Sequence, residues 1–153
     1  MMNRTIFVTF QKEGIHRYPD APAGVEFLKN PHRHIFHFRA TVSVVHNDRD
    51  IEFILFKREL EALYSGGIME IDHKSCEMLA EDLIDYIVKA YPGRTVSVEV
   101  SEDGENGATL TFVFTCFPVY DPPRCLLRSW TLQRFLRLQL RTRDRNRIIR
   151  IFL

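Results

Sequence analysis

Residues 32–46, HRHIFHFRATVSVVH, alternate between two sets of side chains over almost their whole length. Successive side chains of a β-strand point to opposite faces of a sheet, so this alternation predicts a long, half-buried strand. One face would carry His34, Phe36, Phe38, Ala40, Val42 and Val44. The other would carry Arg33, Ile35, His37, Arg39, Thr41 and Ser43. A sheet that covers a core with one of its faces is therefore the first expectation.

The segments around this strand predict further strands. Residues 5–11 (TIFVTFQ) are rich in β-branched and aromatic side chains and predict a strand upstream of it. Residues 12–31 contain prolines and glycines with little periodicity, so we expect a long loop there, of the kind that is often functional. Residues 95–102 and 108–116 predict a hairpin around the turn sequence DGENG at 103–107.

Two helices are predicted between the strand pairs. Residues 55–64 have helical spacing, and Gly66 and Gly67 would end that helix. The second helix would run from about Ser75, a suitable N-cap, to Ala90. Its apolar stripe would be Met78, Leu79, Leu83, Ile84, Ile87 and Val88. The order β-β-α-α-β-β predicts the α+β class, with an antiparallel sheet and both helices on one face.

Composition limits the classes of protein to consider. The chain has 153 residues, 45% of them apolar, and a net charge of +1, which suits one globular domain rather than a disordered chain. No apolar run approaches the ~20 residues that span a bilayer, and the first residues lack a signal-peptide pattern, so we expect neither membrane nor secretion. Three cysteines (Cys76, Cys116 and Cys125) without framework spacing fit a reducing, cytoplasmic location.

The last part of the chain differs from the rest in charge. Residues 111–153 hold nine Arg, no Lys and two Asp, whereas residues 1–110 carry an excess of acidic groups. We therefore predict a domain over 1–116 and a Pro-interrupted, Arg-rich extension over 117–153. The extension could be an arm that binds nucleic acid, a solvated or disordered tail, or unrelated sequence such as a shifted reading frame; the last two are favoured. Any nucleic-acid partner would bind through this tail alone.

Histidines suggest a metal site. His32 and His34 lie two apart on the predicted strand, so both imidazoles share one face with Cα atoms roughly 6.5–7 Å apart. One zinc ion is within reach of both, and His16 in the preceding loop is a natural third ligand. Three protein ligands would leave a fourth position open, as in catalytic zinc sites. Two ordinary histidines bonded to their neighbours are the alternative.

Two further acidic features bear on chemistry. Glu102 continues the apolar face of the strand at 95–102, where a carboxylate needs a partner such as the N–H groups of a heterocycle. A strand end turned into solvent is the alternative. Asp72 and His73 are adjacent, and an Asp beside a His can orient the imidazole for proton transfer, although such neighbours also occur by chance.

Taken together, these motifs resemble one known family. His16-Arg17, His32-Arg33-His34, Ile71-Asp72-His73, Ser75-Cys76-Glu77 and Glu102 are similar, in order and spacing, to motifs of the 6-pyruvoyl-tetrahydropterin synthase and 6-carboxy-tetrahydropterin synthase family. The resemblance covers residues 5–110 and stops near 116. It implies a T-fold subunit with the same element order, which forms homo-oligomers with sites between subunits.

The resemblance also implies roles for particular residues. His16, His32 and His34 would hold Zn²⁺, which would act as a Lewis acid on a dihydroneopterin-type substrate. Glu102 would anchor the pterin-like ring, with help from backbone groups near Ser75 and Cys76. Asp72 and His73 would form part of the catalytic proton-transfer set. The expected activity is that of a lyase.

The chain departs from the family pattern where chemistry would occur. The family's catalytic Cys lies a few residues before the paired histidines, and residues 26–31 contain none. Some members carry Glu in that region and act as dihydroneopterin aldolases, so Glu26 is a candidate catalytic residue. Arg33 replaces a family Gly, and the segment before the second helix is about ten residues shorter. A non-catalytic protein that binds a pterin- or purine-like ligand is therefore the second hypothesis.

Overall fold

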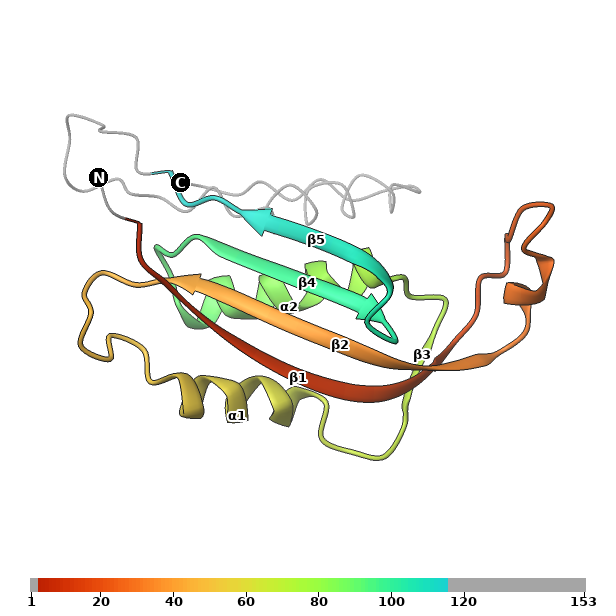
Figure 1. The fold of residues 1–153 in the computed structure, drawn as a ribbon, viewed down its shortest axis with the longest axis horizontal. Coiled ribbons are helices and arrows are strands. Elements are labelled where there is room, and N and C mark those ends of the chain that lie inside the picture. The colour runs from red at the N-terminus through yellow and green to blue at the C-terminus, as the bar shows by residue number, and fades with distance from the viewer. Residues whose placement is uncertain (1–2, 116–153) are drawn as a thin grey trace, which may run out of the picture. The chain divides into compact units, whose positions relative to one another are not determined.

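The computed structural model describes residues 3–115, which form a five-stranded sheet and two α-helices (Figure 1). The elements in chain order are β1 (Thr5–His16), a 3₁₀ turn η1 (Glu26–Lys29), β2 (His32–Ser43), α1 (Phe53–Leu63), β3 (Met69–Asp72), α2 (Cys76–Ala90), β4 (Val96–Glu102) and β5 (Asn106–Phe112). The strands lie in the order β3-β1-β2-β4-β5. The α+β class is therefore confirmed.

The alternation in β2 produces the core face of the sheet. Phe36, Phe38, Ala40 and Val42 are almost completely buried, as the sequence predicts. Neighbouring strands place apolar side chains in register with them, because Phe10 of β1 and Val100 of β4 both pair with Phe38. The rings of Phe10 and Phe38 stack with centroids 4.7 Å apart. Burial of this one face fixes the register of the three central strands.

Both helices pack on that face. Phe56 and Leu60 of α1 and Leu83 and Ile87 of α2 join the buried residues of the sheet in one hydrophobic cluster. The Ser75 hydroxyl accepts a hydrogen bond from the Met78 amide and caps α2 as predicted. The predicted stripe of α2 is wrong at Met78 itself, which is 45% exposed because the helix turns that position away from the sheet.

The sheet differs from the prediction around β1. β1 continues through residues 12–16, which were expected to lie in a loop, because these residues pair with the first half of β2. Gly14 interrupts the strand pattern in the sequence, yet the position suits glycine, since an added Cβ would lie 2.9 Å from the Phe36 ring. β3, which was not predicted, adds in parallel to β1 and makes the sheet mixed rather than antiparallel.

The β4–β5 hairpin closes through a tight turn at residues 102–105. Asp103 and Gly104 both have positive φ, 54° and 76°, and the Glu105 amide donates to the Glu102 carbonyl over 3.0 Å. Asp-Gly is a preferred pair for such a turn, since its twist matches that of the strands. β5 begins at Asn106, two residues earlier than predicted.

Other predictions fall outside residues 3–115. Cys116, Cys125, the extension over 117–153 and any nucleic-acid partner of that tail belong to the part of the chain that is not described. Within the described part, none of the helices has the length and apolar character required to cross a membrane.

Candidate metal centre

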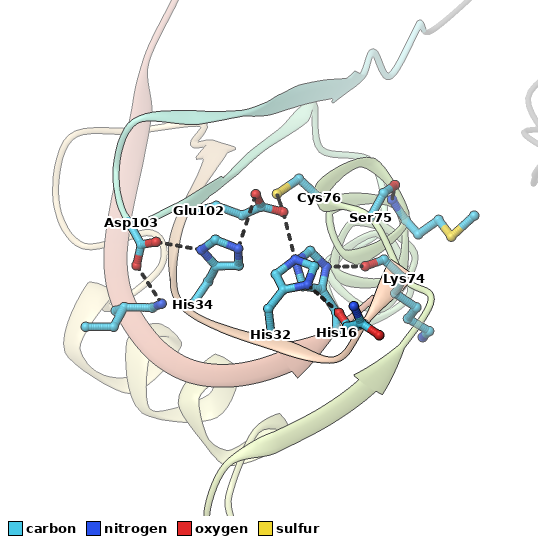
Figure 2. A network of polar contacts seen from close by, with 11 residues as sticks. His16, His32, His34, Lys74, Ser75, Cys76, Glu102 and Asp103 are labelled. Carbon is cyan, nitrogen blue, oxygen red and sulfur yellow. Dashed lines mark hydrogen bonds and ion pairs between the residues drawn. The ribbon is translucent and has the colours of Figure 1, made fainter. Parts of the chain in front are cut away.

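Three histidines meet where β1 ends and β2 begins (Figure 2). The antiparallel register pairs His16 with His32, and the pleat returns His34 to the same face. Ring centroids lie 4.5 Å apart for His16 and His32, 5.1 Å for His32 and His34, and 5.2 Å for His16 and His34. One nitrogen from each ring lies within 4.8 Å of the others, so the three residues could hold a metal ion. His16 comes from a strand rather than from the predicted loop.

Hydrogen bonds assign the proton on each imidazole. Nδ1 of His16 lies 3.3 Å from the Lys74 carbonyl oxygen, and Nδ1 of His32 lies 2.8 Å from that of Asn30. Nδ1 of His34 lies 2.6 Å from Oδ2 of Asp103. Carbonyl and carboxylate oxygens accept, so Nδ1 donates in all three rings and each neutral ring keeps its lone pair on Nε2. Nε2 is therefore the nitrogen that each ring offers to a metal.

The carboxylate of Glu102 faces two of these nitrogens. Oε1 lies 3.4 Å from Nε2 of His16, and Oε2 lies 3.8 Å from Nε2 of His34 (Figure 2). Lone pairs on nitrogen and carboxylate oxygens are all acceptors, so this arrangement needs a proton or a cation among them. The sequence predicts that Glu102 needs a partner such as a heterocyclic ligand. In the structure its carboxylate faces histidines of the same chain instead.

A metal satisfies His16 better than a proton does. His16 is 9% exposed, and within residues 3–115 its Nε2 has no hydrogen-bond partner of good geometry. Burial lowers the pKa of His16, which keeps the ring neutral and able to coordinate. A buried polar atom without a partner is costly, so the chemistry of this donor set fits a transition metal.

Cys76 lies beside Glu102 at the start of α2. Its thiol donates to Oε1 of Glu102 over 3.8 Å. Burial, followed by the charge of Glu102, raises the pKa of the thiol to about 12, so Cys76 is a neutral thiol near pH 7. It therefore does not replace the missing thiolate base. The predicted contacts of Ser75 and Cys76 with a substrate remain predictions.

Asp72 and His73 form a second, exposed pair. Nδ1 of His73 lies 3.0 Å from Oδ2 of Asp72, while Arg17 donates Nε to Oδ1 over 2.8 Å. The hydrogen bond from His73, then that from Arg17, lowers the pKa of Asp72. The backbone ties the pair to the histidine cluster, since Arg17 follows His16 and its amide donates to the Asp72 carbonyl over 2.7 Å. The predicted catalytic pair therefore lies next to the site rather than in it.

Glu26 lies in the β1–β2 connection, on η1. Its carboxylate accepts a hydrogen bond from the Gly24 amide over 2.9 Å, a contact within its own loop. Among the contacts of residues 3–115, none joins Glu26 to the three histidines. Its catalytic role stays a prediction.

Sequence reasoning missed the residues that hold the histidines in place. Asp103 was assigned to a turn, and the carbonyls of Asn30 and Lys74 carry no signal in the sequence. For Asp103 alone a signal exists: an Asp-Gly turn after Glu102 places a carboxylate at the same end of the sheet as His34.

Comparison with known proteins does not add a family to this description. No protein-family model matches the chain, and no curated protein matches its sequence.

Proposed function

We propose that residues 1–116 bind Zn²⁺ through His16, His32 and His34 and act as a lyase on a dihydroneopterin-type substrate. One observation carries the proposal: one nitrogen from each of the three imidazoles lies within 4.8 Å of the others, and the Glu102 carboxylate faces Nε2 of His16 and of His34. Imidazole suits zinc, and three protein ligands leave a position for water or substrate. Zinc in this place supplies Lewis-acid chemistry.

Glu102 would bind the ring of the substrate. Its side chain is 29% exposed, so it is within reach of a ligand at the mouth of the site. A carboxylate offers about four acceptor positions on two oxygens, and the N–H groups of a pterin form a matching donor pair. The start of α2, at Ser75 and Cys76, would provide the neighbouring backbone groups.

His73 would move the proton. It is exposed, and Asp72 holds its Nδ1, which leaves Nε2 able to accept a proton from a substrate. Imidazole is the side-chain group that acts most often as a general base in enzymes. Arg17 fixes the other oxygen of Asp72, so the carboxylate keeps its charge and orientation.

Binding without catalysis is the second candidate function. Two observations favour it: residues 26–31 lack a thiol, and Cys76 is a neutral thiol with a pKa of about 12. A protein of this kind would hold the metal and a pterin- or purine-like ligand and release the ligand unchanged.

Metal analysis followed by product analysis tests the proposal. Protein purified from cells grown with zinc is expected to carry about one zinc ion per chain. Incubation with dihydroneopterin triphosphate should then give an altered pterin. A bound pterin that is released unchanged would overturn the lyase function and leave the binding function. Protein without any transition metal would overturn both proposed functions.

A further inference from the structure

Asp103 touches the candidate site from the turn between β4 and β5. Its Oδ2 accepts from Nδ1 of His34 over 2.6 Å, the shortest of the three Nδ1 contacts in the cluster (Figure 2). The two residues are 69 positions apart, so the fold alone brings them together. His16 and His32 are held by neutral carbonyls, whereas His34 is held by a charge.

Backbone hydrogen bonds fix the position of this carboxylate. The amide of Asp103 donates to the Ile35 carbonyl over 2.8 Å, and the amide of Ile35 donates to Oδ1 of Asp103 over 2.9 Å. These two bonds clamp the turn to β2 one residue beyond His34. Oδ2 is then the free oxygen, and it points at the imidazole.

A clamped carboxylate leaves the ring of His34 one favourable tautomer. Oδ2 accepts only, so Nδ1 must carry the proton, and in the neutral ring Nε2 then carries the lone pair. A carboxylate behind a ligating histidine fixes the orientation of the ring and raises its basicity toward the metal.

We propose that Asp103 is a positioning residue of the metal centre, which holds His34 in the tautomer and orientation that present Nε2 to the ion. The inference rests on the proposed metal site and extends it by naming a residue outside the coordination sphere. It assigns the Asp-Gly turn two tasks: Gly104 helps to close the hairpin, and Asp103 aims a ligand of the neighbouring strand.

Asp103→Asn separates this role from a structural one. Asn tolerates the positive φ of 54° and can keep the bond from the Ile35 amide through its oxygen. Its NH₂ group would then meet Nδ1 of His34, donor against donor, which favours transfer of the ring proton to Nε2. A protonated Nε2 cannot coordinate.

Two measurements test the proposal on the full chain. Long-range ¹H–¹⁵N NMR of metal-free protein should show His34 protonated on Nδ1 in wild type and shifted toward the Nε2-protonated form in Asp103→Asn. Competition with a chelator should show zinc affinity weakened about 10–100-fold in the variant. Asp48→Asn is the matched control, because the Asp48 side chain is 93% exposed in a distant loop, and it should leave both readouts unchanged.

The outcomes are distinct. Asp103→Asn with the His34 tautomer and the zinc affinity of wild type would overturn this inference while the proposed function stands. Wild-type protein that binds no zinc would overturn the two together. Should Asp103→Asn not fold, Asp103→Gly accepts the positive φ and lacks the carboxylate, and the same loss of zinc affinity is expected.

Discussion

The molecule contains two Asp–His pairs that are alike in chemistry and opposite in construction. His34 comes from β2 and Asp103 from the β4–β5 turn. Nδ1 of His34 lies 2.6 Å from Oδ2 of Asp103, and the His34 side chain is 22% exposed. His73 and Asp72 are neighbours in sequence. Nδ1 of His73 lies 3.0 Å from Oδ2 of Asp72, and the His73 side chain is 63% exposed. The first pair depends on the pairing of β2 with β4, whereas the second needs only the last residue of β3 and the residue that follows it.

The difference teaches what each pair can do. A half-buried pair clamped by backbone bonds keeps one geometry and suits a metal ligand, for which orientation decides affinity. An exposed pair at the surface exchanges protons with solvent and with a bound substrate, as a general base must. The two pairs therefore predict different losses when each is changed.

Replacing His32 or His34 of the three-histidine cluster should have the largest effect. His34→Ala or His32→Ala is expected to reduce bound zinc from about one ion per chain to near none, since two imidazoles do not hold the ion as three do. Elemental analysis after gel filtration measures it. His73→Ala is the matched control and should keep its metal; equal metal loss in all three variants would erase the distinction between the pairs.

Replacing the exposed histidine should affect rate alone. His73→Ala is expected to lower turnover of a dihydroneopterin substrate about 10²–10⁴-fold, the usual cost of losing a general base, with metal content unchanged. Steady-state kinetics on zinc-loaded protein provide the measurement. Glu26→Gln serves as the comparison, because it should match this loss only if the aldolase-like chemistry operates; unaltered turnover in His73→Ala would remove the exposed pair from the mechanism.

Glu102→Gln sharpens the comparison between binding metal and binding substrate. The change keeps shape and removes the charge that strengthens a bidentate N–H contact, so pterin affinity should fall about 10–100-fold. Zinc should stay in place, because the three histidines remain. Fluorescence titration with a pterin measures the affinity, and identical affinities in the two proteins would rule out Glu102 as the ring anchor.

The smallest expected effect is on stability in acid. The pKa of Asp72 lies below its ordinary 3.8, because His73 and then Arg17 hydrogen-bond its charged form. The pair therefore stabilises the fold above pH 3.8, and this contribution is lost as the pH falls through the lower folded pKa. Urea unfolding of wild type and Asp72→Asn should differ slightly at pH 7, and the difference should shrink as the pH falls below 3.8; a difference that widens in acid would contradict the assignment.

Much of the fold could be predicted from local pattern. The alternation of Phe36, Phe38 and Ala40 gave the buried face of β2, and Ser75 gave the start of α2. β3 could not be predicted, since it has four residues and exists because an edge of β1 is open to it. The extension of β1 through residues 12–16 could not be predicted, because Gly14 breaks the alternation of side chains. A glycine is needed there because the Phe36 ring occupies the space of a side chain.

The three candidate metal ligands could be predicted from the sequence, but the residues that contact and orient them could not. The two-residue spacing of His32 and His34 predicts that they share one face of a strand. His16 was correctly grouped with them, but it lies at the end of β1 rather than in the predicted loop. The contact of Glu102 with two of these rings depends on the register of β4 against β2, which spacing along the chain does not specify. Asp103 contacts His34 across 69 residues, and its place in an Asp-Gly turn after Glu102 predicts the end of the sheet at which it lies but not this hydrogen bond.

Metal stoichiometry combined with X-ray absorption spectroscopy on wild-type protein tests the central claim most directly. The account predicts about one zinc ion per chain, with three imidazole nitrogens at about 2.0–2.1 Å and one oxygen ligand from water or substrate in the fourth position. Protein that is free of transition metal after growth in zinc, or zinc bound with fewer than three imidazoles, would contradict it.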